Sequence, residues 1–137
     1  MTNYGLGGLC EPHLDPHGIF ELKDGFYGKE RPELYDLGDV LGTFMAWLNN
    51  VQEGGGTAFI GSNFSISAEK GSAAFWYDLK SDGFRDSLTK HGGCPVLVGS
   101  KWILNKWLYW YDNFKKFPCK IDRRRAFDLP SENHYYT

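Results

Sequence analysis

The chain has 137 residues, 42% of them hydrophobic and 23% charged, with a formal net charge of −2. These values are typical of one globular domain with a real core, and the charge gives no argument for a nucleic acid or a membrane surface as partner. Seventeen glycines and six prolines favour many turns and short strands over long helices.

The first stretch with chemical content is YGLGGLCEPHLDPH, residues 4 to 17. It places His13 and Asp15 two residues apart. On a β-strand, residues i and i+2 point to the same face, so the two side chains could bind one metal ion. The alternative is that both are simply polar residues at the end of a strand, because a lone HxD pair is weak evidence. The first ten residues lack the basic and apolar regions of a secretory signal, so we expect no signal peptide in this chain.

Residues 17 to 39 are charged and show no period of 2 or 3.6, which is typical of a binding loop, a lid or a solvated linker. From Thr43 on, TFMAWLNNV and TAFI predict two strands around a turn at 53–56. FSISAEKGSAAFWYDL predicts two more strands, joined at 70–71, the second ending near Leu79.

Two further apolar segments, HGGCPVLV and KWILNKWLYWY, are separated by Gly99 and Ser100. The polar tail that follows includes the run Arg123–Arg125, which we expect to be solvated. Six to eight short strands with turn signals between them predict an all-β sandwich or barrel.

A third candidate ligand, His91, opens the strand HGGCPVLV. One HxD pair and a distant histidine form the pattern of the two-histidine, one-carboxylate triad, which holds Fe(II) on one face and leaves the other positions open. Zinc is the second choice, because it prefers a closed set of more histidine or cysteine ligands.

Lys101 begins an aromatic, apolar segment, where a buried ammonium would need an anionic partner. By alternation it shares a face with Ile103, Asn105 and Trp107, an arrangement that suits a small dicarboxylate. The alternative is an exposed lysine just after a turn. A plain hairpin at Gly99-Ser100 would put His91 and Lys101 on opposite faces. A common site therefore requires either that the chain crosses between sheets here or that a bulge near Pro95 changes the alternation.

The motifs YGLGGLCEPHLD, GGGTAF, GSAAFWYDL and TKHGGCPVLVGSKWILNKWL together resemble the catalytic domain of collagen prolyl 4-hydroxylase α subunits. The resemblance covers roughly residues 3 to 120 and implies a double-stranded β-helix, or jelly roll, of the 2-oxoglutarate/Fe(II) dioxygenases. It implies a dioxygenase domain at 1–120, truncated at its N-terminus, and a polar tail at 121–137. It also implies that the helices supporting the larger sheet are lacking, so that one face of this sheet is exposed.

The resemblance further implies a role for each matching residue. His13, Asp15 and His91 would bind Fe(II), while Lys101, Thr57 and Tyr4 would bind the distal carboxylate of 2-oxoglutarate. The reaction would hydroxylate peptidyl proline in a procollagen-like substrate and release succinate and CO2, with L-ascorbate as a further requirement.

Two implied properties concern the setting of the enzyme. Protein disulfide isomerase is implied as a partner subunit and the endoplasmic reticulum lumen as the location. The residues alone leave the pairing of the three cysteines open. The resemblance implies a Cys94–Cys119 disulfide, which would need such an oxidising compartment.

Three positions depart from the family pattern on the wall that would face the peptide. Cys10 stands in place of a tyrosine, Val40 in place of an arginine, and Tyr109 in place of a histidine, whereas Trp107 is retained. Because valine offers no hydrogen-bond donor, we expect altered peptide preference or weak activity. The alternative function is a jelly-roll module that binds a peptide or a partner protein without turnover.

Overall fold

The computed structural model describes residues 1–17 and 37–113, and nearly all of their regular structure is antiparallel β-sheet. The strands are β1 (Thr2–Tyr4), β2 (Cys10–His13), β3 (Val40–Trp47), β4 (Glu53–Gly54), β5 (Thr57–Phe59), β6 (Phe64–Ile66), β7 (Ala73–Tyr77), β8 (His91–Gly93), β9 (Val96–Val98) and β10 (Lys101–Tyr109). A 3-10 turn, η2 (Ser87–Thr89), precedes β8, and a short helix, α3 (Trp110–Asn113), follows β10.

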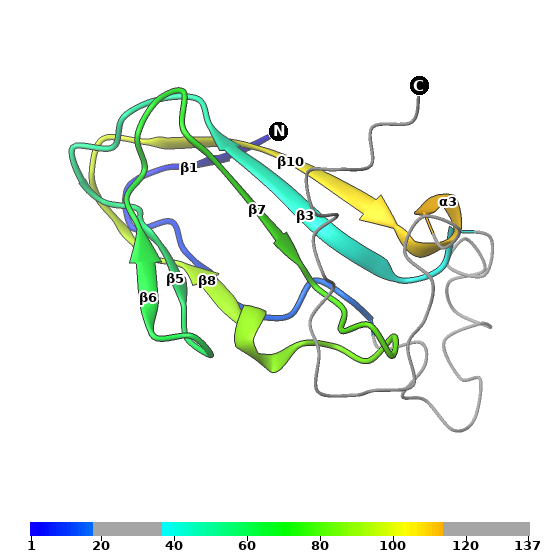
Figure 1. Ribbon diagram of the computed structural model, residues 1–137. Helices are drawn as coiled ribbons and strands as arrows, with labels where there is room; N and C mark the ends of the chain where they lie inside the picture. The colour runs from blue at the N-terminus through cyan, green and yellow to red at the C-terminus, as the bar shows by residue number, and fades with distance from the viewer. Residues whose placement is uncertain (18–36, 114–137) are drawn as a thin grey trace, which may run out of the picture.

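Two four-stranded sheets form the domain, as Figure 1 shows. Sheet A has the order β1-β10-β3-β7 and contains the long strands, and sheet B has the order β2-β8-β5-β6. The small pair β4-β9 forms a third sheet. Every strand pair is antiparallel, and most neighbours in the sheets are not neighbours in sequence. This is the predicted all-β jelly roll.

The core lies between the sheets and is built by alternation along their strands. On β3, Met45 and Trp47 are buried, and they pair with Asn105 and Ile103 of β10. Phe59 from sheet B closes the same cluster. Burying each of these large apolar side chains contributes about 1.5–3 kcal/mol, which is what holds the two sheets together.

The chain crosses from one sheet to the other between His91 and Lys101. Strand β8 lies in sheet B and β10 in sheet A, while β9 between them pairs with β4. Gly99-Ser100 is therefore a crossing and not a plain hairpin, as a common site for His91 and Lys101 requires. The small β4-β9 pair depends on Gly54, which has φ 76° and where a Cβ would lie 2.3 Å from the Pro95 carbonyl oxygen.

Some local predictions need correction or remain open. Asp15 does not lie on a strand with His13, because β2 ends at His13 and Asp15 falls in the bend that follows. The predicted turn at 53–56 begins with strand β4. Most of the predicted loop at 17–39 and the tail at 121–137 lie outside the described residues.

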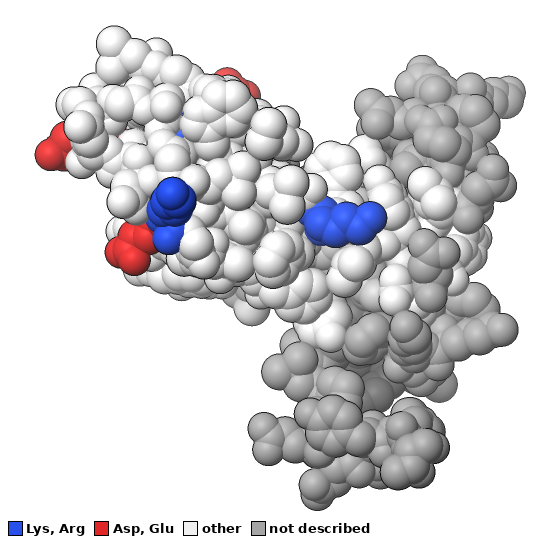
Figure 2. All heavy atoms as spheres, turned by 90° about the horizontal axis from the view of Figure 1, so that it is seen from above, with Lys and Arg blue, Asp and Glu red and all other residues white. Residues whose placement is uncertain are grey.

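The outward face of sheet A exposes large apolar side chains. Phe44 of β3 pairs with Phe75 of β7, and both are exposed, as are Trp102 and Leu104 of β10. Figure 2 shows few charged side chains among the described residues on the face it presents. None of the helices in the described part of the chain is long and apolar enough to span a membrane.

Candidate active site

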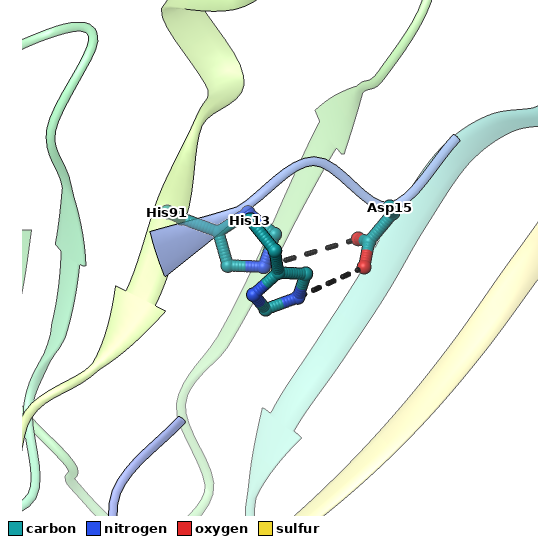
Figure 3. Close-up of side chains that lie close together, drawn as sticks. All are labelled: His13, Asp15 and His91. Carbon is teal, nitrogen blue, oxygen red and sulfur yellow. Dashed lines mark ion pairs between the residues drawn. The ribbon is translucent and has the colours of Figure 1, made fainter. Parts of the chain in front are cut away.

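Three side chains from two separate parts of the chain meet between the sheets (Figure 3). His13, the last residue of β2, pairs with His91, the first residue of β8, so their rings lie side by side with centroids 4.6 Å apart. The bend after β2 turns Asp15 toward both. Asp15 Oδ1 lies 3.4 Å from His13 Nε2, and Asp15 Oδ2 lies 3.9 Å from His91 Nε2.

Backbone contacts orient both imidazoles for metal binding. The His13 Nδ1 atom lies 2.7 Å from the Glu11 carbonyl oxygen, and His91 Nδ1 lies 2.9 Å from that of Thr89. A carbonyl only accepts, so each Nδ1 carries the hydrogen and each Nε2 presents a lone pair. Two such nitrogens and one carboxylate, with ligand atoms all within 4.8 Å of one another, fit a single divalent metal ion.

Burial and the neighbouring charges shift the pKa values of these groups. Burial lowers the pKa of His91, which favours the neutral imidazole that a metal requires. The hydrogen bond to Asp15 raises the pKa of His13, which is the most exposed ligand. Burial acts to raise the pKa of Asp15, but hydrogen bonds from His13 and Thr43 outweigh it and lower this pKa. In this cluster the nearest ring nitrogen to the Asp15 carboxyl group is His13 Nε2, at 3.4 Å.

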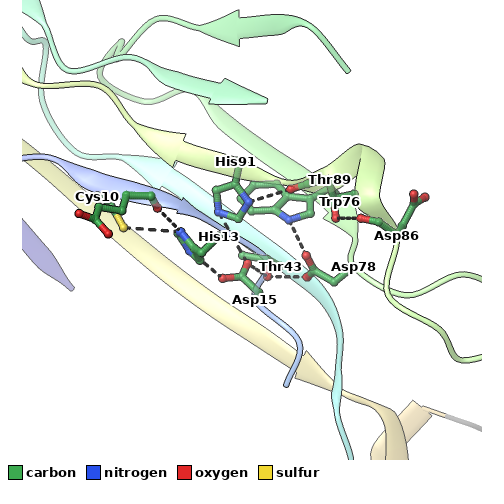
Figure 4. A network of polar contacts seen from close by, with 10 residues as sticks. Cys10, His13, Asp15, Thr43, Trp76, Asp78, Asp86, Thr89 and His91 are labelled. Carbon is green, nitrogen blue, oxygen red and sulfur yellow. Dashed lines mark hydrogen bonds and ion pairs between the residues drawn. The ribbon is translucent and has the colours of Figure 1, made fainter. Parts of the chain in front are cut away.

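A chain of polar contacts extends from Asp15 into the core, as Figure 4 shows. The hydroxyl oxygen of Thr43 on β3 lies 2.7 Å from Asp15 Oδ2 and also 2.7 Å from Asp78 Oδ2. The indole N–H of Trp76 donates to Asp78 Oδ1 at 2.8 Å. Asp78 is fully buried, and burial raises its pKa to about 7.

Lys101 brings a positive charge into the same interior. Its side chain is 3% exposed, and its ammonium donates to the Thr57 hydroxyl at 3.2 Å and to the Gly56 carbonyl at 3.4 Å. The Tyr4 ring lies beside it, with the centroid 5.7 Å from Nζ. Burial lowers the pKa of Lys101. The structure gives this ammonium no carboxylate partner among residues 1–17 and 37–113, so the position suits an anionic ligand.

One cavity of about 190 Å³ joins the histidines to the lysine. Its lining residues include the three candidate metal ligands and the predicted anion-binding set. Strand register fixes the spacing between His91 and Thr57, because Phe59 pairs with His91 and Thr57 pairs with Gly93 in the β5-β8 ladder. Two residues along a strand span about 7 Å, which is the length of a small dicarboxylate.

The proposed substrate wall divides into two pairs. Cys10 and Trp107 line the cavity, and the Cys10 sulfur lies 3.7 Å from His13 Nδ1. Val40 and Tyr109 are paired across the β3-β10 bulge and are not among the residues that line it. Their contact with a peptide stays a prediction.

The cysteine pairing also stays a prediction. Cys10 and Cys94 are free thiols in the described residues. The predicted partner of Cys94, Cys119, lies outside them.

Sequence reasoning missed Thr43, Trp76 and Asp78. Their contacts join β3 to β7, strands whose pairing no local motif encodes. The available signal was an acidic residue placed directly after the aromatic strand in FWYDL, where an apolar residue would be expected.

Comparison with known proteins identifies the family of this chain. A family profile described as the 2OG-Fe(II) oxygenase superfamily matches residues 1–109. The prolyl 4-hydroxylase subunit alpha-3 of Mus musculus is 42% identical over 122 residues, which cover 89% of this chain and 21% of the relative. The alpha-1 subunit of Homo sapiens is 36% identical over 124 residues, covering 88% and 21%. The chain thus spans about one fifth of the length of these relatives.

Among solved structures, the fold is similar to that of a viral collagen prolyl hydroxylase from Paramecium Bursaria Chlorella virus-1 in its 2OG complex. The TM-score is 0.64 at 24% identity, and the match covers 78% of this chain and 55% of the viral one. This similarity supports the jelly-roll fold. With the family profile covering most of the chain, and with the His-Asp-His cluster in place, the chain belongs to the 2OG-Fe(II) oxygenase superfamily.

Proposed function

We propose that this chain is the catalytic domain of a prolyl 4-hydroxylase that uses Fe(II) and 2-oxoglutarate to hydroxylate peptidyl proline, as in procollagen. The observation that carries the proposal is the shared cavity, which joins a His-Asp-His cluster to a buried, unneutralised lysine. The similarity to prolyl 4-hydroxylase subunits supports the choice of substrate class.

The residues of the chain divide the work between them. His13, Asp15 and His91 would hold Fe(II), since their donor atoms already converge. Lys101, with the Thr57 hydroxyl and the Tyr4 phenol beside it, would bind the distal carboxylate of 2-oxoglutarate and so orient its keto acid end toward the metal. The low dielectric of the buried site strengthens that ion pair.

Bound Fe(II) would supply the oxidation itself: O2 and 2-oxoglutarate yield succinate and CO2, and one oxygen atom enters a proline C–H bond. The chain's own task is ligation, orientation and exclusion of water from the cavity. Trp107 and Cys10, which line the cavity, are the described residues best placed to contact the peptide.

The remaining parts of the proposal concern the cellular setting. L-Ascorbate as a reductant, protein disulfide isomerase as a partner subunit and the endoplasmic reticulum lumen as the location follow from the resemblance to collagen prolyl 4-hydroxylases. A Cys94–Cys119 disulfide would fit the oxidising conditions of that compartment.

The first experiment measures anaerobic binding of 2-oxoglutarate in the presence of Fe(II), through the metal-to-ligand charge-transfer absorption. We expect a band that is lost in His13→Ala and weakened in Lys101→Ala. Succinate release with and without a collagen-like peptide then tests turnover. A folded chain that shows no band would refute the proposal.

The same pair of assays addresses the alternative function. A band without peptide-stimulated succinate release would favour a module that binds its ligands without turnover. The free thiol of Cys10 beside His13, in place of the family's tyrosine, is the observation that makes this alternative worth testing. A Cys10→Tyr variant that gains peptide-dependent turnover would assign the difference to this position.

A further inference from the structure

We propose that Thr43 and Asp78 are positioning residues for the metal site: Asp78 donates a hydrogen bond to Thr43, and Thr43 donates one to the carboxylate of Asp15. The inference rests on the proposed metal-binding function, and it assigns roles to two buried residues that touch neither metal nor substrate.

The first argument is a count of hydrogens at Thr43. Its hydroxyl oxygen lies 2.7 Å from one carboxyl oxygen of Asp15 and equally close to one of Asp78. A hydroxyl has a single hydrogen to donate, so it can satisfy only one of these two acceptors. The second contact is a hydrogen bond only if the other carboxyl group carries a proton and donates to the hydroxyl oxygen.

The second argument identifies the protonated group as Asp78. It is 0% exposed, and its Oδ1 already accepts the indole hydrogen of Trp76, so Oδ1 is the carbonyl oxygen and Oδ2 the hydroxyl. The charged groups that act on it, Asp15 and Asp39, are both acidic and oppose a second negative charge. Asp15, in contrast, lies within 4 Å of two imidazoles.

The third argument is that this chain of contacts reaches two of the three candidate ligands (Figure 4). At one end the Thr43 hydroxyl fixes one oxygen of Asp15, which leaves its other oxygen directed at His13. At the other end the Trp76 ring packs edge-on against His91, with centroids 4.9 Å apart. Strands β3 and β7 hold the two ends together, since Thr43 and Trp76 are paired residues. These contacts, which we call the Thr43–Asp78–Trp76 relay, therefore set both the rotamer of Asp15 and the plane of His91.

The test compares Fe(II) affinity of the purified chain under anaerobic conditions, measured by titration calorimetry, across two matched pairs of variants. Thr43→Val removes one donor at nearly constant volume, and Asp78→Leu replaces the carboxyl group with a larger, branched apolar side chain. We expect 10- to 100-fold weaker binding from both. Thr43→Ser keeps the hydroxyl, and Asp78→Asn keeps both an acceptor for Trp76 and a donor for Thr43. Because these two variants keep the hydrogen bonds, we expect their Fe(II) affinity to stay within about threefold of wild type, against the 10- to 100-fold loss expected when such contacts are removed. Thr2→Val on β1 is the control for loss of an exposed threonine hydroxyl.

Co(II) absorption provides a second readout that a purely structural role would not change. Thr43→Val should shift the d–d bands of the Co(II)-loaded protein, and Thr43→Ser should restore them. Wild-type affinity in Thr43→Val, or a folded Asp78→Asn that binds as weakly as Asp78→Leu, would overturn the relay alone. If wild type binds no Fe(II), the proposed function itself fails, and the relay fails with it. Where Thr43→Val does not fold, Asp78→Asn decides.

Discussion

The buried carboxyl group of Asp78 should make the free energy of unfolding of the metal-free chain depend on pH. The Asp78→Asn substitution should abolish this contribution. The pKa of Asp78 is about 7 in the folded protein against 3.8 for an exposed aspartate, chiefly because of burial. Because the folded value is the higher one, protonation favours folding. This contribution is complete below pH 4 and is lost as pH rises through 7. The difference corresponds to about 4 kcal/mol over the whole range, of which roughly 2–3 kcal/mol falls between pH 5 and pH 8.

Urea denaturation with a chelator present, followed by tryptophan fluorescence at pH 5, 6, 7 and 8, measures this dependence. Groups such as His13 and Asp15 titrate in both proteins, so the difference between wild type and Asp78→Asn reports chiefly the buried carboxyl group, together with its smaller charge effect on His13. We expect Asp78→Asn to become the more stable protein as pH rises. Glu69→Gln, which removes an exposed carboxylate, shows what the loss of one negative charge does alone. Parallel profiles of wild type and Asp78→Asn would refute the reasoning.

Three further predictions concern the anion site, the crossing and the outer face. Lys101→Met keeps most of the length of the side chain but removes its charge. It should weaken 2-oxoglutarate binding by about 10-fold or more with Fe(II) affinity unchanged. Calorimetry checks both, and equal loss of both would contradict the assigned role. Gly54→Ala should destabilise the chain by more than about 1 kcal/mol in urea, because its Cβ would overlap the Pro95 carbonyl at positive φ; an unchanged midpoint would show that the turn relaxes. Replacing Phe44 and Phe75 by lysine should raise the solubility limit with the cavity intact, and unchanged light scattering at high concentration would argue against an aggregation-prone face.

The sequence predicted what depends on alternation and on motifs. The face shared by Lys101, Ile103, Asn105 and Trp107 follows from a period of two, and all four line the cavity. The crossing at Gly99-Ser100 followed from requiring one site for His91 and Lys101, and the two residues do lie in opposite sheets.

What escaped prediction depends on pairings between distant strands. Asp15 reaches His13 through a bend, not through strand alternation, and nothing in the HxD spacing distinguishes the two. The Thr43–Asp78 contact joins residues 35 positions apart and exists only because β3 lies beside β7. Likewise, the position of Val40 relative to the cavity depends on the β3-β10 bulge, which no local motif encodes.

In the proposed function, the β5-β8 ladder would also set the distance between the two ends of the ligand. His91 marks one end of this distance, and Thr57, which hydrogen-bonds to Lys101, marks the other, two residues along the same ladder. A slip of one residue would turn Thr57 out of the cavity, and a slip of two would change the span by about 7 Å, more than any small acid could absorb. If the proposed site binds an acid, the length that fits would thus be set by backbone pairing. Substituting His91 or Thr57 would change how tightly an acid is bound, but it would leave the distance between their two backbone positions unchanged.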